Sequence, residues 1–326
     1  MDQILLDIHC HLVPLTPERT EGLPGVAWTP EGTLTVDGYT LASPSVYRVD
    51  SLLAWMDENR VERAWISVPP PLYRLDLAAD AAGDWTTACN EALQAVAARH
   101  ADRLTPLFHL PLQHPALAAE VAGVWAGRAK PLFAMPAGSA SGGVKLSDPA
   151  YAPLWQALDA AGAFLFLHPS KGCDPRYDAF YLQNLLGSPV ETALAAAHLA
   201  LSGIIERHPR MTLCLAHGGG ATAAVAGRLE RGQLTGRPGA ATGADRPRRV
   251  LKSVCVDCIC HDPAALELSA AIHGEDKVLF GSDWPFSMGL PEPHQALAET
   301  RTELRAKIFR DNPRRLLAKY GIAGGG

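Results

Sequence analysis

The sequence predicts an α/β fold, a (β/α)8 TIM barrel that carries a small antiparallel β insertion after its first strand. Short runs rich in Val, Ile, Leu and Phe alternate along the chain with Ala- and Leu-rich stretches of helical period. Eight such runs occur, and each is apolar at consecutive positions, as strands buried on both faces of a parallel sheet require. A length of 326 residues also fits one barrel, because barrels run past ~250 residues as a single unit. We therefore expect one domain over residues 1–326.

The strands and helices of this barrel can be placed in order. The predicted strands are Ile4–His9, Ala64–Val68, Leu104–Phe108, Gly143–Ser147, Phe164–His168, Thr212–His217, Ser253–Asp257 and Val278–Asp283. The predicted crossover helices are Asp50–Arg60, Trp85–His100, Pro115–Gly127, Pro149–Ala161, Pro189–His208, Ala221–Gly232, Pro263–Gly274 and Pro293–Ile308. Several of these helices open with Pro in the first turn and several end at Gly. A terminal helix is expected over Asp311–Tyr320.

Two segments depart from the alternation. Pro14–Tyr47, after the first strand, contains the strand-like runs Val26–Thr29 and Thr33–Val36 beside Pro-Glu-Gly and Asp-Gly turn signals. We expect residues 14–47 to form an antiparallel insertion at the carboxyl-terminal mouth of the barrel. Gln233–Arg249 is rich in Gly, Pro, Thr and Arg and is expected to be a mobile surface loop.

The composition argues against several classes of function. The chain has 29 basic and 34 acidic side chains and a net charge of -5, so no large basic face for nucleic acid is expected. Neither a membrane span nor the basic start of a signal peptide is recognisable. Seven cysteines do not form a secreted disulfide framework, and the Cys-x-x-Cys pair at 255 and 258 would point to opposite faces of a strand. A cytoplasmic enzyme is therefore predicted.

The first strand carries a histidine pair. His9 and His11 are two residues apart, so their side chains project to the same face, and the strand end points into the barrel mouth. Two neutral imidazoles that converge there provide half of a transition-metal site. The alternative is an unlinked pair of polar residues at a strand end.

Three later strands also end in residues of ligand type. His168, His217 and Asp283 close the fifth, sixth and eighth predicted strands. A single His after an apolar strand is usually a core or rim residue, but these three meet the first strand at the catalytic face. The set therefore predicts a metal site. Asp257, at the end of the seventh strand, could orient a ligand. His109 and His261, after the third and seventh strands, could reach the mouth, and further polar candidates there are Tyr73, Arg74 and Lys171.

These motifs, in this order, resemble the amidohydrolase superfamily. Within it the chain is most similar to the branch of 2-amino-3-carboxymuconate-6-semialdehyde decarboxylase and related metal-dependent decarboxylases. The resemblance runs from the first strand to the last helix. The matching stretches are Asp7-Ile-His-Cys-His11-Leu-Val-Pro, Leu167-His168-Pro169, His217-Gly-Gly-Gly220 with Gly227-Arg228, and Gly281-Ser-Asp283-Trp-Pro-Phe286.

The resemblance implies a ligand set and a reaction. One divalent metal, Zn²⁺ by expectation with Mn²⁺ as the alternative, would be held by His9, His11, His168 and Asp283. His217 would be the catalytic acid/base over a metal-bound water. The expected reaction is non-oxidative decarboxylation of an aromatic or unsaturated carboxylic acid. The alternative is hydrolysis of a lactone, amide or C–C bond, in which His217 acts as the base and Asp283 handles protons. A catalytically silent binding protein is the third hypothesis.

Four further residues are candidates for substrate binding. A strand-four Lys bridges two metals in binuclear amidohydrolases, but this branch works with one, so Lys145 is expected at the rim or against a substrate carboxylate. Arg228 resembles an arginine that reaches a neighbouring subunit's site and binds a carboxylate, which implies a homodimer. Otherwise it is a surface Arg of an outer helix. Trp284 and Phe286 either offer aromatic surface to a planar substrate or pack the loop.

Overall fold

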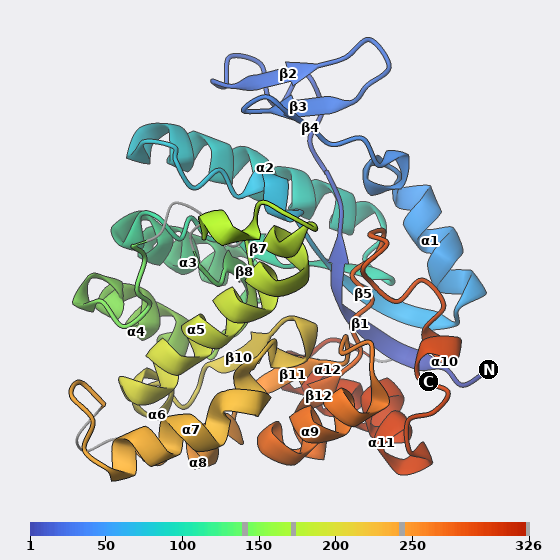
Figure 1. Ribbon diagram of the computed structural model, residues 1–326. Helices are drawn as coiled ribbons and strands as arrows, with labels where there is room; N and C mark the ends of the chain where they lie inside the picture. The colour runs from blue at the N-terminus through green and yellow to red at the C-terminus, as the bar shows by residue number, and fades with distance from the viewer. Residues whose placement is uncertain (139–142, 171–173, 241–244, 324–326) are drawn as a thin grey trace.

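The computed structural model describes residues 1–138, 143–170, 174–240 and 245–323 and has a parallel β core with helices packed against it (Figure 1). One sheet has the order β1-β5-β6 and a second has the order β12-β11-β10-β9-β8-β7. Their bounds are β1 Ile4–His11, β5 Val61–Ser67, β6 Leu104–Pro106, β7 Phe108–His109, β8 Leu132–Pro136, β9 Phe164–His168, β10 Thr212–Leu215, β11 Cys255–Asp257 and β12 Val278–Leu279.

Backbone hydrogen bonds join the two sheets at both of their edges. β6 and β7 are consecutive pieces of one strand position, and the N–H of Leu107 between them donates to the Ile66 carbonyl of β5 at 2.8 Å. At the other edge the Ile8 N–H of β1 donates to the Phe280 carbonyl, directly after β12, at 3.0 Å. The strand order therefore returns to its start, and the predicted barrel is confirmed.

Bulky side chains fill the barrel interior towards the amino-terminal ends of the strands. The rings of Trp65 and Phe164 meet edge to face at 4.8 Å between centroids, and both are fully buried. Tyr320, after the last helix, packs on these rings at 6.1 and 6.4 Å. Because this end is plugged by apolar groups, the polar residues of the barrel lie at the carboxyl-terminal ends of the strands, where active sites of this fold are found.

Helices pack around the outside of the strands (Figure 1). Their bounds are α1 Val49–Glu58, α2 Ala79–Arg99, α3 Pro115–Arg128, α4 Ala152–Ala160, α5 Ser188–Leu201, α6 Ile204–Arg207, α7 Thr222–Leu234, α8 Pro247–Leu251, α9 Pro263–His273, α10 Pro293–Ala296, α11 Thr302–Ala306 and α12 Asn312–Lys319. Within the described ranges, no helix is long and apolar enough to cross a membrane.

Four predictions of secondary structure are wrong. The helix expected over 189–208 is divided into α5 and α6, because Gly203 between them has left-handed backbone with φ of +72°. The fourth strand is β8 rather than Gly143–Ser147, because the buried run Leu132–Pro136 pairs with β7 and β9, while residues 143–147 lie in the loop that follows. The helix expected over 293–308 is divided into α10 and α11, and a π-helical turn over Lys307–Asp311 leads into α12. The loop expected over 233–249 already contains the first turn of α8.

The predicted insertion is an antiparallel sheet beyond the end of β1 (Figure 1). It has three strands, β2 Val26–Trp28, β3 Leu34–Val36 and β4 Tyr39–Thr40, one more than expected. Arg74, which follows β5, ties the insertion to the barrel. Its guanidinium donates to both oxygens of Asp37 at 2.8 Å and to the Pro24 carbonyl at 2.6 Å.

We expect Arg74→Ala to loosen the insertion and to lower the free energy of unfolding by about 1–3 kcal/mol, because charge-assisted hydrogen bonds are lost from a buried guanidinium. The half-exposed Asp37 carboxylate can regain water, which limits the loss. Denaturant unfolding and limited proteolysis between β2 and β4 measure both effects. Arg19→Ala is the control, because Arg19 makes an exposed 3.8 Å ion pair with Glu91 in place of a buried set of hydrogen bonds. Equal behaviour of the two variants would contradict this account.

Candidate metal centre

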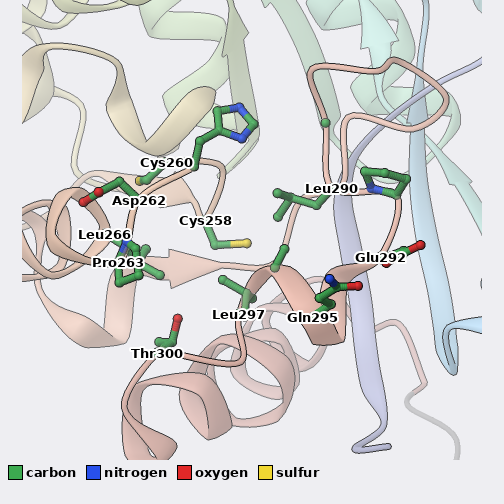
Figure 2. A pocket seen from close by; sticks show the side chains of 14 residues that line it. Cys258, Cys260, Asp262, Pro263, Leu266, Leu290, Glu292, Gln295, Leu297 and Thr300 are labelled. Carbon is green, nitrogen blue, oxygen red and sulfur yellow. The ribbon is translucent and has the colours of Figure 1, made fainter.

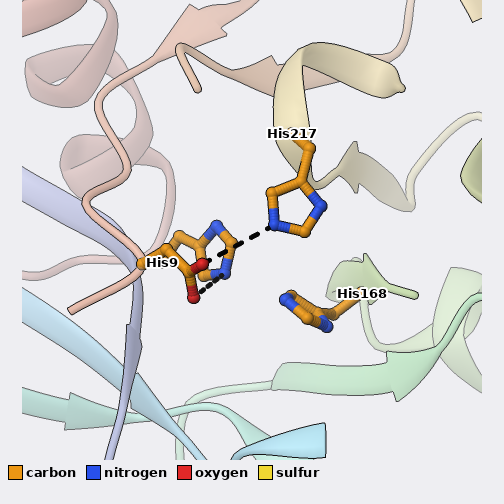
Figure 3. Close-up of side chains that lie close together, drawn as sticks. His9, His168 and His217 are labelled. Carbon is orange, nitrogen blue, oxygen red and sulfur yellow. Dashed lines mark ion pairs between the residues drawn. The ribbon is translucent and has the colours of Figure 1, made fainter. Parts of the chain in front are cut away.

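The structure brings the five predicted ligand and acid/base residues together at the barrel mouth. One ligand atom from each of His9, His168, His217 and Asp283 lies within 4.8 Å of the others. Figure 3 shows the three histidine rings gathered around one point. His11 belongs to the same cluster, since its Nε2 lies 3.2 Å from both the His9 Nε2 and the Asp283 Oδ1. Residues more than 270 positions apart in the sequence therefore share one centre.

The geometry of β1 directs both of its histidines into the barrel. The register of β1 against β5 shifts between Asp7 and Cys10, which is the signature of a bulge. Bulges next to active sites re-aim side chains. Here His9 and His11 are both fully buried, and their rings meet edge to face at 5.1 Å.

Each of the three histidines predicted as ligands is held by its Nδ1 atom. The Nδ1 of His9 lies 2.7 Å from a carboxylate oxygen of Asp257, that of His11 lies 3.2 Å from the Val68 carbonyl, and that of His168 lies 2.9 Å from the Pro169 carbonyl. The Ser67 hydroxyl also lies 3.1 Å from the Nδ1 of His11, but it donates to the Cys10 carbonyl at 3.2 Å. Because the carboxylate and the two carbonyls only accept, the hydrogen-bond network assigns a proton to each Nδ1. When a metal is bound, each Nε2 is then left with its lone pair facing the others.

The donor set fits one divalent metal ion. The Nε2 of His168 is buried and has no hydrogen-bond partner among the described residues. A cation is the partner that three imidazole lone pairs and a carboxylate require. Burial lowers the pKa of His9, but Asp283 and Asp257 outweigh it and raise that pKa to about 10. In the metal-free protein His9 therefore carries an extra proton, which supplies positive charge beside the Asp283 carboxylate.

The surrounding charges keep Asp283 ionised. Burial alone would raise its pKa, but His9, His11 and His217 hold it well below the usual range. Burial also lowers the pKa values of His11 and His168, and their neighbouring histidines add to the effect. A carboxylate and neutral imidazoles are the protonation states that metal binding needs.

Two of the candidate residues have left-handed backbone. His217 and Asp283 both have φ of +56°, which is uncommon for residues other than Gly. Such conformations persist only where the surroundings hold them, and they concentrate at functional sites. At His217 the backbone N–H donates to Asp257 at 2.9 Å, and the Asp283 N–H donates to the His9 carbonyl at 2.7 Å.

Sequence reasoning gave no role to Asp7, which is buried below the metal centre. Its carboxyl accepts from the backbone N–H groups of His9 at 2.9 Å and Ser282 at 3.1 Å, and from the Ser282 hydroxyl. Burial raises its pKa to about 7. Asp7 thereby ties the first strand to the segment that carries Asp283. Its place two residues before His9 in an otherwise apolar strand was the available signal.

The four substrate-binding candidates lie in different surroundings. The ring of Phe286 is 5.5 Å from that of His11, so it forms a wall of the metal centre. Trp284 is only 8% exposed and packs in the hydrophobic core. Arg228 is exposed on α7. Lys145 is exposed in the loop after β8, and burial together with its charge lowers the pKa of His198. The prediction that Lys145 lies on the fourth strand is therefore wrong.

Tyr73 and His109 form a second aromatic layer. Their rings stack with an interplanar angle of 2° at 5.6 Å, and the Tyr73 ring also contacts His168 at 6.2 Å. Burial lowers the pKa of His109 to about 4, so its ring is neutral. Lys171 lies outside the described residues.

His261 is not one of the residues that gather in the metal cluster. It lines a cavity of about 330 Å³ between the segments that follow β11 and β12. Cys258, Cys260 and Glu292 line the same cavity (Figure 2).

Comparisons with known proteins agree with the fold. The family model described as Amidohydrolase matches residues 6–319. The 2-amino-3-carboxymuconate-6-semialdehyde decarboxylase of Dictyostelium discoideum is 35% identical over 164 residues, which cover 49% of this chain and 45% of that protein. The gamma-resorcylate decarboxylase of Rhizobium radiobacter is 26% identical over 299 residues, or 83% of this chain and 88% of that protein.

A solved structure has the same architecture. The dihydroxybenzoic acid decarboxylase of Polaromonas, determined with bound manganese, superposes with a TM-score of 0.77 at 18% identity, covering 98% of this chain and 97% of that one. The match to the Dictyostelium protein spans less than half of that relative, whereas the family model spans nearly the whole described chain. From its first barrel strand to its last helix, this chain belongs to the amidohydrolase family.

Proposed function

We propose that the protein is a metal-dependent, non-oxidative decarboxylase of an aromatic or unsaturated carboxylic acid. The observation that carries the proposal is the cluster of His9, His11, His168 and Asp283, with the partly exposed His217 beside it. The decarboxylases among its relatives support this reaction class. Because the first of these relatives is matched over less than half its length, the activity and the substrate class are proposals for this chain.

In this mechanism each residue has a separate task. His9, His11, His168 and Asp283 would hold the metal, which when bound supplies a Lewis acid for substrate oxygens and lowers the pKa of bound water towards ~7. His217, 3.8 Å from the Asp283 carboxylate and 21% exposed, holds a proton where substrate can reach it. His217 delivers that proton to the carbon that bears the carboxylate. The C–C bond then breaks, CO2 leaves, and the bonding electron pair stays with the substrate carbon.

We propose Zn²⁺ as the resident ion, with Mn²⁺ as the alternative. Three imidazoles and one carboxylate are ligands that both ions accept, so the ligand set alone constrains the identity loosely. The manganese in the Polaromonas enzyme supports the alternative. We also propose that residues 1–326 form one domain. The six described cysteines are free thiols, which supports the expected cytoplasmic location.

A hydrolase remains the second candidate function. Arg228, the expected carboxylate ligand, is exposed on α7 of its own chain. Without a partner subunit the site would lack that contact. For hydrolysis of a lactone, an amide or a C–C bond, His217 would act as the base that takes a proton from water, and a metal held by the cluster would supply Lewis-acid chemistry.

CO2 release separates the two functions. Metal-replete protein is assayed with a panel of aromatic and muconate-like acids, and in parallel with lactones and amides, each against chelator-treated protein. We expect CO2 release from at least one acid and only from the metal-replete protein. Hydrolysis without CO2 release from any acid would overturn the decarboxylase and leave the metal centre intact.

Arg228→Ala should lower kcat/KM for the acid by about 10- to 100-fold, because a bidentate, charge-assisted contact to the carboxylate is lost. Arg231→Ala is the matched control, since Arg231 is an exposed Arg one turn along α7. Mixing Arg228→Ala subunits with His217→Asn subunits tests the dimer directly. If Arg228 acts on the partner's site, one site of each mixed dimer is intact, and about a quarter of wild-type activity returns. A mixture no more active than its components would refute action across subunits.

The aromatic residues at the mouth complete the proposal. Phe286 is proposed to line the substrate's planar face, because its ring already lies against the metal centre. Trp284 and Lys145 stay candidates for substrate binding.

A further inference from the structure

Asp257 is a buried carboxylate outside the proposed ligand set. It ends β11, has no exposed surface, and accepts four hydrogen bonds. Its Oδ2 accepts from the Nδ1 of His9 at 2.7 Å and from the backbone N–H of His217 at 2.9 Å. Its Oδ1 accepts from the backbone N–H groups of Gly218 at 2.8 Å and Ile259 at 3.1 Å. A single oxygen atom therefore touches both a ligand ring and the backbone of the proposed acid/base.

Hydrogen bonding and close packing from α9 and from the segment after β11 also hold the turn that carries His217. The carbonyl of Gly218 accepts from the Ser269 hydroxyl of α9 at 2.8 Å. A Cβ atom on Gly218 would come within 2.3 Å of the Cys260 Sγ, so the turn packs directly on the segment after β11. This close packing fixes the direction of the His217 and Gly218 N–H groups, which point at the Asp257 carboxylate.

The donors around Asp257 require a carboxylate rather than an amide. Three of them are backbone N–H groups, which cannot become acceptors. The fourth, His9, can accept at Nδ1 only if its proton moves to Nε2, the atom that faces the metal. In one orientation, the NH2 group of an amide at this position would face the N–H groups of Gly218 and Ile259, donor against donor. In the other orientation it would donate to the Nδ1 of His9, which would move the ring proton to Nε2 and prevent metal binding through that atom.

We propose that Asp257 is a positioning residue that fixes the metal-binding tautomer of His9 and, through the same oxygen, holds the backbone of His217 over the metal centre. The proposal rests on the proposed function, because it assigns the metal to the His9 Nε2 and proton transfer to His217. It adds a physical link between ligand strand β1 and the turn after β10. Loss of this one carboxylate should therefore affect metal binding and catalysis together.

Asp257→Asn and Asp7→Asn form a matched pair that tests this link. Both carboxyl groups are fully buried and both bond to residue 9, but Asp7 reaches only its backbone. An amide can replace Asp7 without loss, because its oxygen still accepts from the His9 and Ser282 N–H groups. Its nitrogen can then donate to the Ser282 hydroxyl, which turns to the His9 carbonyl 3.3 Å away.

The first measurement is Zn²⁺ affinity by competition with a chromophoric chelator, which does not depend on catalysis. We expect Asp257→Asn to weaken the affinity by about 10- to 100-fold and Asp7→Asn to change it much less. Equal affinities in wild type and Asp257→Asn would overturn the proposal. If no substrate is ever turned over, the metal measurement still decides the role of Asp257 in orienting His9.

The second measurement keeps the proposal testable if Asp257→Asn does not fold. In zinc-loaded wild-type protein, ¹⁵N NMR of the histidine rings should show His9 protonated at Nδ1, with a slowly exchanging proton. Zinc on the Nδ1 of His9, or an unprotonated Nδ1, would overturn the assigned tautomer. Where Asp257→Asn does fold, its activity at saturating zinc reports on the other bond. We expect kcat to stay reduced there, because the His217 turn has lost its acceptor, and full recovery of kcat would refute that half of the proposal.

Discussion

Replacing His217 with Asn should lower the rate of CO2 release by about 10²- to 10⁴-fold while the bound metal is retained. An amide occupies similar space but cannot give up or accept a proton near neutral pH. His217 is the most exposed member of the cluster, and its Nε2 lies 3.8 Å from the Asp283 Oδ2, compared with 3.2–3.3 Å for the contacts of His11 and His9 with Asp283. It is therefore positioned to serve substrate rather than to complete the metal shell.

The assay pairs single-turnover CO2 release with metal analysis of the same sample. His198→Asn is the control, because His198 is a partly buried histidine of α5 that bonds Ser147 instead of the cluster. Metal analysis is needed to tell a metal ligand from an acid/base, because a ring nitrogen of His217 also lies within the 4.8 Å cluster. A His217→Asn protein that loses its metal as well as its activity would make His217 a ligand and would remove it from the acid/base role.

The positions of the metal-centre residues could be predicted because they follow from strand periodicity. His9 and His11 share a strand face, and His168 ends an apolar strand of the same barrel, so their convergence needs only the barrel topology. Of the groups that fix these rings, the sequence predicts only Asp257, as a strand-end residue that could orient a ligand. The acceptors on their Nδ1 atoms are two backbone carbonyls and, for His9, a carboxylate 248 positions away, and the bond to Asp257 depends on the exact register of β11.

The misplaced fourth strand shows where local pattern fails. Leu132-Phe-Ala-Met-Pro136 contains Ala and Pro, which are depleted in strands, whereas residues 143–147 contain the β-branched Val144 and alternate apolar with polar positions. Burial against β7 and β9 decides in favour of the first segment, because tertiary pairing outweighs intrinsic preference. The error also put Lys145 on the fourth strand, whereas it is exposed in the loop after β8, and its expected place at the rim or against a substrate carboxylate stays a prediction.

Replacing His168 with Phe should abolish stabilisation by metal without destabilising the metal-free protein. The aromatic ring keeps its packing against His9 and His11, at 4.8 and 4.9 Å between centroids. The lost bond from Nδ1 to the Pro169 carbonyl costs about 0.5–1.5 kcal/mol, whereas removing the buried, unpartnered Nε2 relieves a penalty of about 1–3 kcal/mol. The metal-free variant should therefore unfold at an equal or higher denaturant concentration than the metal-free wild type.

With metal bound, we expect the wild type to be more stable than His168→Phe, the reverse of the order expected without metal. An ion at 100 times its dissociation constant stabilises a folded protein by about 2.7 kcal/mol, and only the wild type should gain this amount. His109→Phe is the matched control, because His109 is equally buried and also has an unpartnered nitrogen among the described residues, yet lies beyond Tyr73 from the metal. Unfolding of all three proteins with and without Zn²⁺ gives the comparison. If His168→Phe gained as much stability from zinc as His109→Phe does, the unpartnered nitrogen of His168 would not be a metal ligand, and the proposed shell would have to be built on His217 instead.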